Sequence, residues 1–95
     1  MGKFKLIADD AKMAEIIEKC KELLCNNRLF KLEDIERDNI TLEGKFGFDY
    51  GMDSLVRVEY IMLIEEDFDL GIPDDEAEKL DCVGEVCNWL YQKIM

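Results

Sequence analysis

The chain of 95 residues contains no histidine, a single proline and no long uninterrupted apolar run. Histidine is the commonest general acid–base group and a frequent metal ligand, so its absence argues against a stand-alone hydrolase or zinc enzyme. No apolar stretch approaches the roughly 18 residues of a membrane-spanning helix. The opening MGKFKLIADD also lacks the apolar core of a secretory signal. We therefore expect a cytoplasmic protein that is neither an enzyme nor a membrane protein.

The composition is strongly acidic, with 23 acidic against 12 basic residues and a formal net charge of −11. Hydrophobic residues still make up 48% of the chain, which suffices for one folded domain over residues 1–95. The negative charge repels phosphate backbones and anionic lipid headgroups, which argues against nucleic-acid and membrane-surface partners. The same charge favours partner proteins that carry basic patches.

Four cysteines stand in two pairs with four residues between their members, at Cys20, Cys25, Cys82 and Cys87. Zinc binding is the more specific interpretation of such pairs. Both pairs, however, lie in segments with helical character, where positions five apart point about 140° away from one another. We therefore interpret the cysteines as small hydrophobic residues and expect no metal site.

The acidic run DFDLGIPDDEAE superficially resembles a calcium-binding loop, with Asp67 first and Glu78 twelfth. Gly71 occupies a position that requires a side-chain oxygen, and Ile72 the position of the turn glycine. A calcium-binding protein is accordingly a distant alternative.

Helical periodicity of apolar residues predicts three main helices, at about 11–25, 53–69 and 83–94, and Pro73 opens a short acidic fourth. Aspartates precede the first two helices and are suited to cap them. One side of the second helix is marked by Leu55, Val58, Ile61, Met62 and Phe68. Arg28–Met52 has no sustained period, apart from a possible short helix over 31–38, and we expect an ordered loop whose apolar side chains hold it to the core. The prediction is an all-α four-helix bundle, three main helices plus one short helix, with a long loop between helices 1 and 2.

Ser54 follows Asp53 at the start of the second predicted helix. A serine hydroxyl needs an adjacent base to act as a nucleophile, and neither histidine nor a G-x-S-x-G motif is present. Two interpretations remain open from the residues alone. Ser54 is either a capping or solvated residue, or a site where another enzyme attaches a group.

The run Gly51-Met52-Asp53-Ser54-Leu55 and the following VRVEYIMLIEEDFDLGIPDDEAEKL resemble the acyl carrier protein family. The signature of that family is Gly-x-Asp-Ser-Leu at the start of the second helix, followed by an acidic and apolar helix. Further matching residues are Val58, Glu59, Glu65, Glu66, Phe68, Ile72, Pro73, Asp74, Ala77 and Glu78. The resemblance runs without a gap from about Ile40 to the C-terminus, which is more than half of the chain.

The resemblance implies a 4′-phosphopantetheine on Ser54, installed by a phosphopantetheinyl transferase, with Asp53 and Leu55 completing the attachment site. The terminal thiol of that group would hold acyl groups as thioesters. The implied partners are acyl-transfer and biosynthetic enzymes of fatty-acid or related lipid and secondary-metabolite pathways. Their basic patches would dock on Glu59, Met62, Glu65 and Glu66. We expect the carrier to be a monomer. A helix N-terminus favours a phosphodiester, and an acidic helix steers basic partners.

The sequence departs from the family pattern beside the serine. Val56, followed by Arg57, stands where an acid is usual, and Tyr50 replaces the usual leucine before the motif glycine. These differences suggest a specialised carrier with its own partners. The alternatives are a peptidyl or aminoacyl carrier of the same fold, and an unmodified carrier-like module that only mediates protein contacts.

Overall fold

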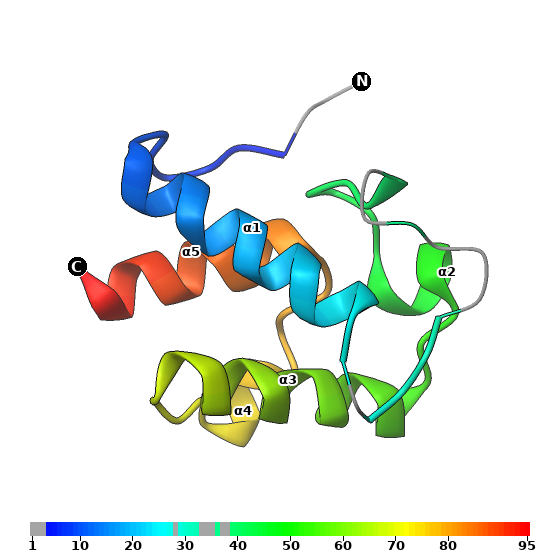
Figure 1. Cartoon of the computed structure of the whole chain (residues 1–95). Coiled ribbons are helices and arrows are strands. Elements are labelled where there is room, and N and C mark those ends of the chain that lie inside the picture. The colour runs from blue at the N-terminus through cyan, green and yellow to red at the C-terminus, as the bar shows by residue number, and fades with distance from the viewer. Residues whose placement is uncertain (1–3, 28, 33–35, 37–38) are drawn as a thin grey trace.

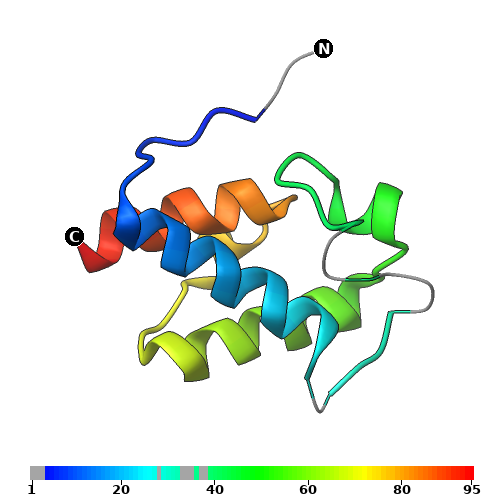
Figure 2. The same ribbon diagram turned by 45° about the horizontal axis from the view of Figure 1, so that its top comes forward.

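The computed structural model describes residues 4–27, 29–32, 36 and 39–95, and it confirms an all-α fold. These residues form the helices α1 (Ala11–Cys25), α2 (Phe46–Tyr50), α3 (Ser54–Phe68), α4 (Asp74–Ala77) and α5 (Val83–Ile94). Figures 1 and 2 show α1 lying diagonally against both α5 and α3, while α4 lies beside α3.

The first helix begins and ends where its periodicity predicts. The Asp10 carboxylate accepts a hydrogen bond from the Met13 amide at 3.0 Å and so caps α1. The core side of α1 is buried, through Met13, Ile16, Cys20 and Leu24. Asn26, which ends the helix, has φ −129° and not the left-handed conformation that asparagine tolerates.

The core side of α3 differs from the side that its periodicity marked. Tyr60, Leu63 and Ile64 are its buried residues. In contrast, Leu55, Val58 and Met62 are 66%, 55% and 46% exposed. The helix is apolar on two sides, so periodicity finds an apolar stripe without showing which stripe meets the core. Asp69 ends α3 in the left-handed conformation, with φ 55°.

The connection between α1 and α3 is held to the core by apolar side chains, as expected for the residues that the structure describes. Ile40, Phe46 and Met52 are buried within it. It also contains α2, which the prediction of a plain loop missed, because five residues are too few to show a helical period. The possible short helix over 31–38 lies mostly outside the described residues.

The fifth helix supplies the other half of the core through Val83, Gly84, Val86, Cys87 and Leu90. All four cysteines are free, with Cys20, Cys82 and Cys87 buried and Cys25 half-buried. Burial raises the pKa of Cys82 above its ordinary value, which favours the neutral thiol. The cysteines thus pack as small apolar residues.

Candidate functional site

Ser54 is the first residue of α3, and its side chain is exposed. The residue before it caps the helix, because Asp53 Oδ1 accepts a hydrogen bond from the Val56 amide at 3.0 Å. Asp53 lies outside the helix with extended backbone angles, φ −79° and ψ −177°. The capping role therefore belongs to Asp53, and the Ser54 hydroxyl is not needed for it.

A tight turn between α2 and α3 fixes the position of Ser54. Gly51 has φ 66°, a left-handed conformation that glycine adopts without steric cost. Met52 follows it, buried, and its amide donates to the Phe46 carbonyl at 3.0 Å. A buried anchor and a helix cap thus stand directly before Ser54 and hold the start of α3 against the core.

Ser54 lines a groove of about 570 Å³ between α3 and the segment 72–80. The residues from α3 recur at helical spacing, so they share one side of the helix. They are Ser54, Arg57, Val58, Ile61, Met62 and Glu65. The remaining lining residues are Phe46, Ile72, Asp74, Ala77, Glu78 and Leu80. The apolar side of α3 that does not face the core therefore forms one wall of this groove.

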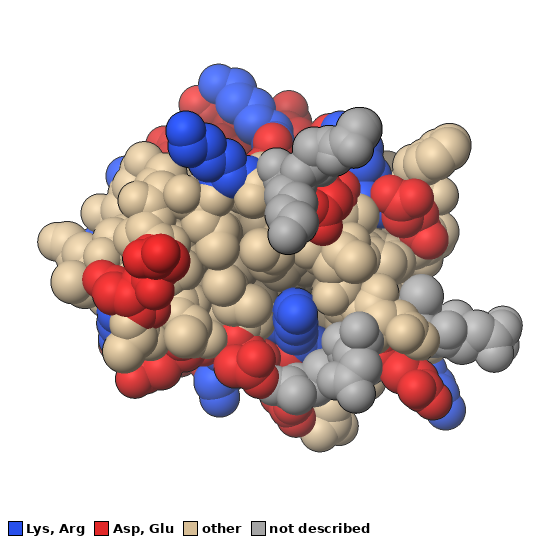
Figure 3. Space-filling view, turned by 90° about the horizontal axis from the view of Figure 1, so that it is seen from above, with Lys and Arg blue, Asp and Glu red and all other residues tan. Residues whose placement is uncertain are grey.

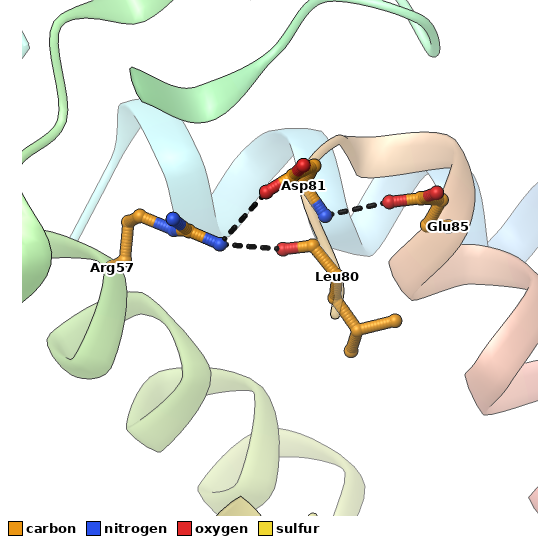
Figure 4. A network of polar contacts seen from close by, with 4 residues as sticks. All are labelled: Arg57, Leu80, Asp81 and Glu85. Carbon is orange, nitrogen blue, oxygen red and sulfur yellow. Dashed lines mark hydrogen bonds and ion pairs between the residues drawn. The ribbon is translucent and has the colours of Figure 1, made fainter. Parts of the chain in front are cut away.

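Arg57 joins the two walls of the groove (Figure 4). Its Nη2 donates to the Leu80 carbonyl at 3.1 Å and pairs with Asp81 Oδ1 at 3.0 Å. The Asp81 amide donates to Glu85 Oε1 at 2.6 Å, and its carbonyl accepts from the Phe46 amide at 2.8 Å. Asp81 is thus a junction at which α2, α3 and α5 meet.

A second polar contact ties the walls near the other end of α3. Glu65 Oε2 accepts a hydrogen bond from the Ile72 amide at 2.8 Å. Glu65 was predicted from the resemblance as a docking residue, and the structure gives its carboxylate a contact within the fold. This contact shapes the turn from α3 to α4.

The predicted site residues divide into two sets. Ser54, Met62 and Glu65 share the groove. The other predicted residues are not among its lining residues; they are Asp53, Leu55, Glu59 and Glu66. Leu55 and Glu66 are exposed, and Glu59 is half-buried. Sequence reasoning missed Phe46 and Leu80, which line the groove from outside α3. It also missed Asp81, the partner of Arg57. One signal in the sequence could have indicated this wall of the groove. It is the helical spacing of Ser54, Arg57, Ile61 and Glu65, which places them on one side of α3.

Comparisons with known proteins show the family to which the chain belongs. The family model for a phosphopantetheine attachment site matches residues 29–90. An acyl carrier protein of Picosynechococcus sp. is 39% identical over 79 residues, which cover 83% of this chain and 91% of the relative. The acyl carrier protein of Clostridium acetobutylicum is 40% identical over 75 residues, 79% of this chain and 91% of the relative. The chain belongs to the acyl carrier protein family.

The fold is also that of an acyl carrier protein, as a comparison with the solved structure of the acyl carrier protein from Enterococcus faecalis shows. That structure superposes with a TM-score of 0.68 at 28% identity and covers 84% of this chain and 95% of that one. The prosthetic group of the family is a covalently attached 4′-phosphopantetheine. The residues present fit such a group, because an exposed hydroxyl stands at the start of a 15-residue helix and beside an open groove.

Figure 3 shows how the charged groups lie on one face of the carrier. On that face, seen from above, the acidic and basic groups of the described residues are interspersed around a broad uncharged area, and these residues form no single acidic patch there. Among the described residues, no three His, Cys, Asp or Glu side chains cluster as a metal site would require. The helices of that part of the chain are also too short or too polar to cross a membrane.

Proposed function

We propose that Ser54 bears the 4′-phosphopantetheine and that the protein carries acyl groups for enzymes of fatty-acid or related lipid biosynthesis. The observation that carries the assignment is that Ser54 is the chain's only serine. It is exposed, lies at the start of α3 and lines the groove. When attached, the group supplies a thiol that holds the cargo as a thioester, and the chain itself has no catalytic role.

The lining of the groove supports an acyl cargo over an aminoacyl one. Its apolar members are Phe46, Val58, Ile61, Met62, Ile72, Ala77 and Leu80. Burying a hydrocarbon chain against such residues is favourable by about 0.8 kcal/mol for each methylene. An aminoacyl group offers less hydrocarbon than a fatty-acyl chain, so it would gain less from this apolar lining.

Partner enzymes would meet the exposed surface of α3, and we propose Leu55, Glu59, Met62 and Glu66 as its contact residues. Leu55 and Met62 offer apolar area, 66% and 46% exposed. Glu59 and Glu66 offer negative charge to basic patches, on the transferase as well as on the biosynthetic enzymes. The cytoplasm, where such enzymes and coenzyme A meet, is the proposed location.

The attachment is tested by the intact mass after incubation with coenzyme A and a phosphopantetheinyl transferase of broad specificity. We expect a gain of one phosphopantetheine, which Ser54→Ala abolishes. Because Asp53 caps α3, Ser54→Ala should retain the native circular dichroism spectrum. Thr41→Ala is the matched control, since Thr41 is also an exposed residue with a hydroxyl group. If Ser54 is the attachment site, Thr41→Ala should gain the same mass as the wild type. No gain with several transferases would favour an unmodified interaction module.

A further inference from the structure

We propose that Arg57 is a specificity-determining residue that limits the length of the acyl chain the groove can hold. It does so by tying α3 to Leu80 and Asp81, and we call these contacts the clasp. This inference rests on the proposed carrier function, since it takes the groove as the place where the cargo chain is sheltered.

The clasp lies where it can control the separation of the two walls. Arg57 is three residues after Ser54, so the two side chains lie on the same side of α3, about 4.5 Å apart along the helix axis. The guanidinium reaches from this wall to the Leu80 carbonyl and the Asp81 carboxylate. Figure 4 shows it spanning the space between α3 and the start of α5.

Two polar contacts join the walls of the groove, the Glu65–Ile72 contact and the clasp, and the clasp is the one that controls whether the groove opens. Glu65 holds the Ile72 amide seven residues away, next to the turn that joins the walls covalently. Arg57 and Asp81 are 24 residues apart, at the end of the groove away from that turn. Breaking the Glu65 contact loosens the turn, whereas breaking the clasp frees the walls to separate.

Asp81 gives the clasp a firm anchor on the second wall. Its backbone is held from two sides, by the Phe46 amide and by the Glu85 carboxylate. Asp81 therefore stays in place, and widening the groove requires Arg57 to give up its contacts. The two side chains remain 31% and 50% exposed, so the pair is weak enough to open when a chain offers sufficient apolar burial.

A short chain can be buried while the clasp stays closed. A longer chain has to push the guanidinium aside, which leaves an arginine without its acceptors beside apolar groups. The gain in stability from each added methylene should consequently level off at a certain length. Without the clasp, the gain should continue to rise beyond that length.

The test uses the holo protein loaded with straight saturated acyl chains of increasing length. For each chain, the thermal midpoint of the acylated form is compared with that of the same holo protein, so a variant's own stability cancels. We expect the midpoint gain to level off at a shorter chain in the wild type than in Arg57→Gln or Asp81→Asn. Lys79→Gln removes the same charge as Arg57→Gln from an exposed residue outside the groove lining, and should behave as wild type.

Thioester cleavage by hydroxylamine gives a second readout, and we expect it to be several-fold slower with long chains in the two clasp variants. Equal midpoint gains in all four proteins would overturn the proposal. Loss of every gain in the clasp variants would also overturn it, by showing that the clasp builds the groove. Failure of the carrier function itself would appear earlier, as a missing phosphopantetheine in the intact mass.

Discussion

The Tyr91 hydroxyl on α5 donates a hydrogen bond of 2.6 Å to the carboxylate of Asp10, the cap of α1. One carboxylate therefore caps one helix and ties it to another. Two hydrogen bonds hold the pKa of Asp10 below its ordinary value of 3.8. The bond from Tyr91 has the larger effect, and the bond from the Met13 amide adds to it. The bond between Tyr91 and Asp10 also raises the pKa of Tyr91.

This pair predicts an acid-sensitive contribution to stability. Because the pKa of Asp10 is lower in the folded state, its contribution is fully present above the ordinary value of 3.8 and is lost as pH falls through the folded value. Tyr91→Phe should lower the stability at neutral pH, and the difference from wild type should shrink below about pH 4. Urea unfolding over that pH range measures it. Asp9→Asn, which changes a charge next to Asp10, should leave the effect of Tyr91→Phe unaltered.

A close approach of Phe4 to Gly84 gives a second prediction. A Cβ at Gly84 would collide with the Phe4 ring, so glycine in α5 makes room for the N-terminal segment. Alanine is the better helix former by about 1 kcal/mol. Gly84→Ala should nevertheless destabilise the fold by about 1–3 kcal/mol, through overpacking. The double variant Phe4→Ala/Gly84→Ala should recover part of that loss, and strictly additive effects in urea unfolding would contradict the contact.

The sequence predicted the helices well where a single apolar stripe coincides with caps. In α1 the stripe and the Asp10 cap agree, and the bounds of α5 agree as well. The prediction was incomplete for α3, which has apolar residues on two sides. The contacts of Tyr60 with Cys20 of α1 and Phe46 of α2 turn this side of α3 toward the core, which leaves Val58 in the groove. Arg57 likewise appeared as a charge next to Ser54, because its partner Asp81 is 24 residues away.

Tyr60 is the clearest case of a residue that periodicity left unassigned. It is fully buried, its hydroxyl donates to the Cys20 carbonyl at 2.8 Å, and its ring packs edge-on against Phe46 at 5.4 Å. Burial raises the pKa of Tyr60 well above 10.0. Tyr60→Phe should cost about 1 kcal/mol, the net value of one hydrogen bond. Tyr60→Ala should cost about 3–5 kcal/mol by leaving a cavity, and similar costs for both variants in urea unfolding would contradict this arrangement.

Two glutamates of α3 that the resemblance groups together should respond differently to substitution. The Glu65 carboxylate holds the Ile72 amide, so Glu65→Ala should destabilise the fold by about 1 kcal/mol. Any loss of partner docking in that variant would therefore combine two effects. Glu59 is half-buried and does not line the groove, and Glu59→Lys should weaken docking while leaving the unfolding free energy close to wild type.

The KM for the carrier in transfer by a phosphopantetheinyl transferase, measured at low and high salt, separates these effects. Glu59→Lys should raise KM several-fold at low salt, and the difference should narrow at high salt because screening weakens the lost attraction. Glu15→Lys makes the same change of charge on the exposed surface of α1 and should alter KM little. An equal rise in both variants would mean that net charge alone steers the encounter. Unfolding of Glu59→Lys, seen by circular dichroism, would show instead that Glu59 supports the fold.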